Sequence, residues 1–278
     1  MLSQARYKPI LLFIFLSVCC LFCEEPSDYE LNSKGLNFIV VNGLLTNEKK
    51  AHEIIISSPV ESLNEKPKPV SGLEVYIYNG DSLFTLTENP LNSGIYKTSS
   101  DFRAVINRAY TLIIISSDSR YYASAYMLPT TPFNKLKYYF AEDQQMFTID
   151  SVNQVFDLSE SALYKVQIDW TNVSGYESLP ESSKKATLYY YTLSTIDISE
   201  LFSPEKEKIY FPAGTIIVES KYSLTPEHAS FIRTMLLETE WRGGGFDVAH
   251  GNVETNLSKG AFGFFAASTI IRDTIFVE

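Results

Sequence analysis

The 278-residue chain carries 33 acidic and 23 basic residues, a formal charge of −10 at pH 7. A surface with this excess of negative charge repels polyanions, so we expect no electrostatic binding of nucleic acid or of anionic head groups. Hydrophobic residues make up 45% and aromatic residues 14% of the chain. Because Tyr and Phe favour strands over helices, the composition predicts an all-β or β-dominated fold.

The N-terminus has the pattern of a secretory signal. Arg6 and Lys8 precede an apolar run from Ile10 to Phe22. A membrane-spanning helix needs about 20 apolar residues, and this run is shorter and contains Ser17 and two cysteines. We therefore predict a signal peptide over residues 1–22, with a transmembrane helix as the less favoured alternative.

The three cysteines of the chain, Cys19, Cys20 and Cys23, all lie at the end of this run. They are either apolar filler within the signal or include the lipid attachment site of a bacterial lipoprotein, and we favour attachment. Cys23 is preferred because the acidic residues that follow it read as the start of a tether over residues 23–36. Cys20 is the second choice, and Cys19, preceded by Leu16-Ser17-Val18, is the third. Several acyl chains on one cysteine anchor a protein firmly in a membrane.

The region 37–128 has the pattern of a β-sandwich. Short apolar or alternating runs, each bounded by Gly, Asn, Pro or Ser, predict strands at 37–45, 51–58, 73–79, 94–98 and 109–116. A further strand, YYASAYM, ends at Pro129-Thr130-Thr131-Pro132, where two prolines oppose regular pairing. We predict a domain boundary there.

A second β-rich domain is predicted over residues 134–278. Longer strands are expected at 162–173, 186–193 and 214–222, separated by polar inserts at 174–185 and 197–208 that are candidate recognition loops. Two further strands, 261–266 and 269–277, are expected to pair with each other.

One amphipathic helix is predicted near residues 225–241. Thr225 is suited to the N-cap and Pro226 to the first turn, and Gly243-Gly244-Gly245 follows as a stop. The apolar side chains spaced three or four apart are Phe231, Ile232, Met235 and Leu236. We expect this stripe to pack on the second sheet, and a helix-in-groove contact with a partner is the alternative.

The runs FIVVNGLLT (38–46), VSGLEVYIYN (70–79) and NSGIYKT (92–98), with a closing run at 243–268, resemble a Bacteroidota surface lipoprotein family known only as a domain of unknown function. The most specific positions are in the closing run: Gly243, Gly244, Gly245, Phe246, Asp247, Asn252, Asn256, Gly260 and Gly263. The acidic residues after Cys23 also resemble those of surface-exposed Bacteroidota lipoproteins. The resemblance implies an accessory role beside a TonB-dependent outer-membrane transporter, and it supplies no catalytic residues.

The N-terminal region separately resembles an Ig-like sandwich of the transthyretin or carboxypeptidase-regulatory type. The matching residues are Val70, Ser71, Gly72, Val75, Gly94, Tyr96, Tyr110, Thr111 and Leu112. Such modules are usually scaffolds or spacers, so this likeness implies a fold and no activity.

Motifs of catalysis and cofactor binding are scarce. The sequence has no Gly-x-Ser-x-Gly elbow, no His-Glu-x-x-His helix and no phosphate-binding glycine loop. Of the three histidines, His52 and His228 are expected to have packing or solvated roles. Asp247, His250 and Glu254 lie within eight residues and could gather around a cation, but a solvated loop is the preferred interpretation. Asn252 and Asn256 could instead close turns through their side-chain amides.

We therefore expect a non-enzymatic binding or accessory lipoprotein of the outer membrane, facing the cell exterior beside a TonB-dependent barrel and using no cofactor. A hydrolase acting on surface polymers is one alternative, and it requires a pocket where two carboxylates, or His250 with acids, converge. A structural or adhesive surface protein is the other.

Overall fold

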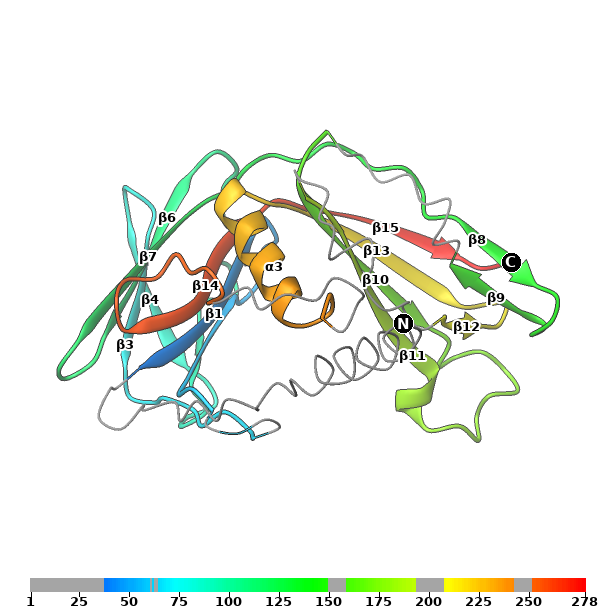
Figure 1. Cartoon of the computed structure of the whole chain (residues 1–278), viewed down its shortest axis with the longest axis horizontal. Coiled ribbons are helices and arrows are strands. Elements are labelled where there is room, and N and C mark those ends of the chain that lie inside the picture. The colour runs from blue at the N-terminus through cyan, green and yellow to red at the C-terminus, as the bar shows by residue number, and fades with distance from the viewer. Residues whose placement is uncertain (1–37, 61, 63–64, 150–158, 194–207, 243–251) are drawn as a thin grey trace, which may run out of the picture. The chain divides into compact units, whose positions relative to one another are not determined.

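A computed structural model describes residues 38–60, 62, 65–149, 159–193, 208–242 and 252–278. These residues contain fifteen strands, one α-helix and one short 3-10 helix, so the all-β expectation is confirmed (Figure 1). All of them belong to one unit of the chain, Asn37–Glu278. The signal peptide, the tether and the three cysteines lie outside the described residues.

The first sheet contains eight strands in the order β14-β1-β2-β5-β4-β3-β6-β7. Each of the strands predicted for the region 37–128 is present, including the run YYASAYM as β7, and β4 occurs in addition. Along β6, Tyr110, Leu112 and Ile114 are buried and alternate with more accessible residues, as expected for a sheet with one covered face. The bounds are β1 Ile39–Thr46, β2 Glu53–Ser57, β3 Glu74–Tyr78, β4 Leu83–Glu88, β5 Ile95–Lys97, β6 Ala109–Ile115, β7 Arg120–Tyr126 and β14 Ala261–Ser268.

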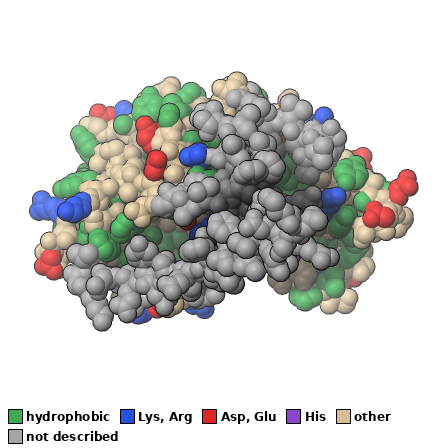
Figure 2. Space-filling view, viewed as in Figure 1, with side chains coloured by type: hydrophobic (Ala, Val, Ile, Leu, Met, Phe, Trp, Pro, Cys, Tyr) green, Lys and Arg blue, Asp and Glu red, His purple; other side chains and the backbone are tan. Residues whose placement is uncertain are grey.

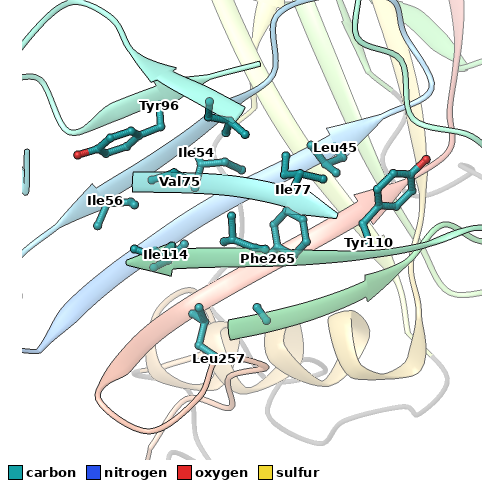
Figure 3. Packing of buried hydrophobic residues seen from close by; sticks show 14 of the residues in the cluster. Leu45, Ile54, Ile56, Val75, Ile77, Tyr96, Tyr110, Ile114, Leu257 and Phe265 are labelled. Atoms are coloured by element: carbon teal, nitrogen blue, oxygen red, sulfur yellow. The ribbon is translucent and has the colours of Figure 1, made fainter. Parts of the chain in front are cut away.

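The covered face of this sheet encloses a hydrophobic core. Side chains from several strands converge on it, including Ile54, Ile77, Ile114 and Phe265, which are all fully buried (Figure 3). Although β7 and β14 are at opposite ends of the strand order, they contact each other. The sheet therefore curls until its two end strands meet.

Tyr96 connects two of the short motifs in this region. Its hydroxyl group donates a hydrogen bond to the carbonyl of Val70 at 3.0 Å and accepts one from the amide of Leu73 at 3.1 Å. Gly94 has a φ of +67°, and a Cβ there would lie 2.4 Å from the carbonyl oxygen of Ile56. The Gly-x-Tyr motif therefore requires its glycine for a close backbone approach and its tyrosine for a buried hydrogen bond.

The prediction that 261–266 pairs with 269–277 is wrong. β14 pairs with β1 in parallel, whereas β15 (Ile270–Phe276) pairs with β13 in a different sheet. A single residue, Thr269, separates the two strands, and even the tightest common hairpin needs a two-residue loop. The chain therefore passes from one sheet to the next at Thr269, and the region beyond the predicted boundary contributes a strand to the first sheet.

The second sheet has the order β11-β10-β13-β15, and a small third sheet has the order β12-β9-β8. The strands predicted over 162–173, 186–193 and 214–222 are present as β10, β11 and β13. Val166, Ile217 and Phe211 belong to the core shared by these two sheets. The bounds are β8 Tyr138–Ala141, β9 Met146–Ile149, β10 Ala162–Asp169, η1 Glu181–Lys184, β11 Lys185–Thr192, β12 Tyr210–Phe211 and β13 Ile216–Ser223.

The predicted helix is present as α3, which spans Pro226–Glu238. The Thr225 side chain accepts a hydrogen bond from the amide of His228 at 3.2 Å, as the N-cap expectation requires. Ile232 and Leu236 are buried in a cluster with Leu163 of β10, so this part of the apolar stripe packs on the second sheet as predicted. Phe231 of the same stripe instead stacks on Phe264 of β14 in the first sheet. The helix ends before the glycine triplet 243–245, which lies outside the described residues.

A buried charge holds the crossover between the first and second sheets. Lys221 of β13 is fully buried, and its ammonium group donates to the Glu160 carboxylate and to the Thr131 carbonyl and hydroxyl oxygens, the latter two at 3.2 Å each. Burial raises the pKa of Glu160, but the hydrogen bonds from Lys221 and Thr131 outweigh it and hold that pKa below its usual value. The Thr131 region, where two prolines oppose regular pairing, is thus fixed by side-chain contacts.

Within the described residues, no helix is long and apolar enough to cross a membrane.

Candidate functional site

The closing run, which contains the most specific positions of the sequence, is only partly described. Gly243, Gly244, Gly245, Phe246 and Asp247 lie outside the described residues, and so does His250. Asn252, Asn256, Gly260 and Gly263 are described. Asn252 is exposed, whereas the other three lie where the chain approaches and enters β14.

Asn256 bridges the two end strands of the first sheet. Its side-chain amide donates to the carbonyl of Ser124 on β7 at 2.9 Å and to the carbonyl of Phe265 on β14 at 2.7 Å. Its side-chain oxygen accepts a hydrogen bond from the amide of Phe265 at 3.1 Å. One asparagine side chain thus satisfies three backbone groups that a missing strand would otherwise pair.

Residues 254–258, called the bridging segment below, continue this contact on both sides. Thr255 donates from its hydroxyl to the carbonyl of Gly263 on β14 at 2.7 Å, and the amide of Ser258 donates to the carbonyl of Tyr122 on β7 at 2.8 Å. Leu257 points into the core of the first sheet (Figure 3). At the other end, the amide of Glu254 donates to the hydroxyl of Thr234 on α3 at 3.1 Å. The bridging segment therefore joins β7, β14 and α3.

Gly263 allows β14 to lie against β1. Its φ is +89°, and a Cβ built there would lie 2.1 Å from the carbonyl oxygen of Val41, which real side chains do not approach. Gly260 also has a positive φ, +94°, in the turn before β14, and its carbonyl accepts a hydrogen bond from the amide of Ile39. Both glycines serve backbone geometry.

The predicted cation ligands are not brought together within the described residues. Asp247 and His250 lie outside them, and Glu254 is exposed. No group of three His, Cys, Asp or Glu side chains that could hold a metal ion occurs in the part of the chain that the structure describes. The cation hypothesis therefore stays a prediction.

A pocket with about 300 Å³ of empty space, open to solvent, lies beside Asn256. It is formed where β7, β14 and the start of α3 meet. The ring of His228 stacks on Phe264 with centroids 5.0 Å apart, and Phe231 also stacks on Phe264 with centroids 4.7 Å apart. Burial lowers the pKa of His228 to about 4, so its ring is neutral at physiological pH and acts as an aromatic wall.

A second pocket, with about 600 Å³ of empty space, lies on the second sheet between β10 and the start of β13. Its one carboxylate, Asp169, accepts a hydrogen bond from the amide of Thr171 at 2.9 Å and lies 3.9 Å from the ammonium group of Lys185. Nucleophilic or general-base chemistry needs a second converging group, and the lining supplies none. The remaining lining residues are Gln167, Asn172, Val173, Gly214, Ile216 and Val218.

His52 has a packing role, as expected from its position in a predicted strand. It is 2% exposed, with Nε2 3.0 Å from the hydroxyl of Thr46 and its ring edge against Phe102. Burial and then the charge of Lys50 lower its pKa. No acid orients Nδ1, which has no hydrogen-bond partner, so a Ser-His-Asp arrangement is not formed at this position.

The two polar inserts are described to different extents. Residues 197–207 lie outside the described residues, whereas 174–185 form turns, the helix η1 and the first residue of β11. Leu179 in this insert is 43% exposed. A role of this loop in recognition stays a prediction.

Sequence reasoning missed the stack of His228, Phe231 and Phe264, because residues 228 and 264 are brought together only by the packing of α3 on β14. It also missed Glu219, which is 1% exposed in the middle of β13. The strand that contains Glu219 was predicted. The available signal for a buried carboxylate was the position of Glu219 inside the apolar pattern of that strand.

The chain matches the family model "Domain of unknown function (DUF4249)" over residues 24–273. The fold and the bridging segment define a β-dominated module in which Asn256, Gly260 and Gly263 join strands of the first sheet. The protein belongs to this family. No curated protein matches the chain.

We predict that Asn256→Ala lowers the free energy of unfolding by about 2 kcal/mol, because three backbone groups lose their partner. Asn256→Asp should cost at least as much at pH 7, since a carboxylate then faces the carbonyl oxygens of Ser124 and Phe265. It should recover at pH 4, where the protonated acid again donates a hydrogen bond. Urea unfolding at both pH values measures this, with Asn252→Ala as the exposed control. Wild-type stability in Asn256→Ala would contradict a structural role.

We predict that Gly263→Ala is more destabilising than Gly80→Ala. Both glycines have similar positive φ values, +89° and +94°, but a Cβ at position 80 meets nothing within 4 Å. Backbone strain alone should cost about 1 kcal/mol at position 80, and the approach to Val41 should add about 2 kcal/mol or more at position 263. Thermal unfolding of the two variants tests the difference, and equal losses would mean that β14 moves freely away from β1.

Proposed function

We propose that this protein is a lipid-anchored, non-catalytic binding or accessory module on the outer surface of the outer membrane, working with a TonB-dependent transporter. One observation carries the non-catalytic part of the proposal. Asn256 and Gly263, two of the most specific signature positions, are used for hydrogen bonds and backbone contacts between strands. These two signature residues therefore serve the fold of the protein.

The membrane part of the proposal rests on the N-terminus. A basic leader, an apolar run and Cys23 followed by acidic residues form the pattern of a lipoprotein signal. The Bacteroidota origin and the partnership with a transporter rest on the resemblance of the sequence to surface lipoproteins of that group. A tether of about 13 residues spans at most roughly 45 Å when extended, which suffices to place the module beside a barrel.

The outer face of the first sheet supports a binding role. Tyr78 on β3, Leu83 on β4, and Tyr122 and Tyr126 on β7 are each more than 40% exposed. Tyrosine is enriched in protein interfaces because its rigid ring combines apolar area with a hydroxyl group. In Figure 2, Lys/Arg and Asp/Glu side chains are scattered among the coloured residues of the face shown.

The strands β1 to β7 also support a finer proposal, that this region is a transthyretin-like or carboxypeptidase-regulatory sandwich. Its support is the Tyr96 contact with Val70 and Leu73, which joins the two motifs on which that resemblance rests. The module would then serve as a scaffold that presents loops and a sheet face.

We predict that Cys23→Ala releases the protein from membranes, whereas Cys19→Ala and Cys20→Ala leave it bound. Loss of the acyl chains removes the anchor, because the acidic chain has no electrostatic affinity for anionic lipid. Membrane fractionation and mass spectrometry of the mature N-terminus measure the outcome. A diacylglyceryl group on Cys20, or an unmodified terminus, would contradict the assignment.

We predict that a photoreactive residue at Leu179, in the described polar insert, crosslinks to a TonB-dependent barrel in intact cells. The matched control is the same residue at Leu91, which is 78% exposed but lies in the turn between β4 and β5. Protease added to intact cells should also digest the protein. Complete protection, together with no crosslink from either position, would instead indicate a module that faces the periplasm.

A further inference from the structure

The central strand of the second sheet places two ionisable side chains in the interior. In β13, Ile217, Glu219, Lys221 and Ser223 are all buried and share one face of the strand. β10 on one side and β15 on the other cover the strand edges. The Glu219 and Lys221 side chains are therefore both held in the interior, 1% and 0% exposed.

The two groups are compensated very differently. The Lys221 ammonium group is paired with the Glu160 carboxylate and donates to both oxygen atoms of Thr131. Glu219 accepts a hydrogen bond from the backbone amide of Leu136, but its second carboxylate oxygen, Oε2, has no hydrogen-bond partner. An ionised carboxylate in that position has one donor and no cation.

The groups that face Glu219 make its negative charge still less favourable. Opposite it on β15 is Asp273, and on β10 it is opposite the apolar Val166. Tyr190 of β11 is close enough for the charge of Glu219 to raise the tyrosine pKa, after burial. From the crossover, Leu136 contributes only its backbone amide and a buried apolar side chain.

We propose that the crossover 131–137 and the adjoining hairpin β8–β9 stay packed over Glu219 while its carboxyl group is protonated and open when it ionises, because opening lets water solvate a carboxylate that has one donor and no cation in the interior. Lys221 fixes the Thr131 end of this crossover through its hydrogen bonds to both oxygen atoms of Thr131. Glu219 lies at the Leu136 end, next to β8, where Tyr139 and Phe140 are about 45% exposed. Ionisation of Glu219 therefore favours release of the Leu136 end of the crossover, together with the hairpin β8–β9 that follows it.

The sign of the pH dependence follows from the environment. Burial and then the charge of Asp273 raise the pKa of Glu219 to about 7 from its ordinary 4.5. Between these two pKa values, the closed form of the crossover retains a proton on Glu219 that the opened form loses. The equilibrium constant for opening of the crossover therefore increases as the pH rises from 4.5 to about 7, and it levels off above that. Between pH 5 and pH 8 the opening equilibrium should increase about 70-fold.

Hydrogen exchange of the full-length protein in detergent tests this, using peptides that cover residues 131–141. The ratio of exchange rates between wild type and Glu219→Gln, taken at each pH, cancels the intrinsic pH dependence of exchange. This ratio should rise about 70-fold from pH 5 to pH 8. The ratio for residues 109–115, in β6 of the first sheet, should stay constant.

A second variant keeps the test independent of the stability of Glu219→Gln. Asp273→Asn removes a negative charge opposite Glu219 and should therefore lower the pKa of Glu219 in the closed form. The opening equilibrium should then level off at a lower pH, and at a lower final value, than in wild type. A ratio that does not change between pH 5 and pH 8, or an equal rise in residues 109–115, overturns the proposal. So does a Glu219 carboxyl carbon whose NMR titration is centred near 4.5.

Discussion

The eight-stranded sheet depends on the closure of the seam between β7 and β14. A curled sheet leaves two edges with unpaired backbone groups, and such edges invite pairing with other chains. Here the edges are not joined by direct strand pairing. The bridging segment lies between them, and the Asn256 side chain supplies a donor to each strand and an acceptor to one.

The same seam connects the first sheet to the rest of the molecule. β14 continues through Thr269 into β15, so a single extended stretch contributes to two sheets. Beside it, the carbonyl of Leu128 accepts hydrogen bonds from the hydroxyl groups of Thr269 and Ser223, at 2.6 and 2.9 Å. The chain thus crosses between the sheets twice in the same place, and hydroxyl side chains satisfy the backbone where regular pairing stops.

Local chemistry was sufficient to predict much of this fold. The strands with apolar or alternating patterns and the start of α3 at Thr225-Pro226 are features that a few neighbouring residues specify. The pairing of β14 with β1 was not predictable in this way, because the register joins residues more than 200 positions apart and no hairpin links these two parallel strands. The short strands β8, β9 and β12 were missed because two to four residues carry too little periodicity.

The same distinction between local and long-range features applies to the candidate site. Asn256 was predicted to use its side-chain amide for structure, but its partners on Ser124 and Phe265 depend on the curl of the sheet. The buried Glu219 and Lys221 stand two residues apart in a run that reads as an ordinary strand, and only the crossover from Thr131 to Leu136 places them in an interior. Local sequence patterns describe strands well and describe the neighbours of strands poorly.

The signature residues that the structure describes in β14 and the bridging segment lie at contacts between strands. Residues such as Gly263 and Asn256 are constrained by contacts with backbone atoms, so they define the fold of a member without defining what it binds. Under the proposed binding role, recognition would depend on other parts of the surface, such as the tyrosines of β3 and β7 and the turns around Leu179. These side chains are exposed, so a change there would alter the proposed binding surface without opening the seam.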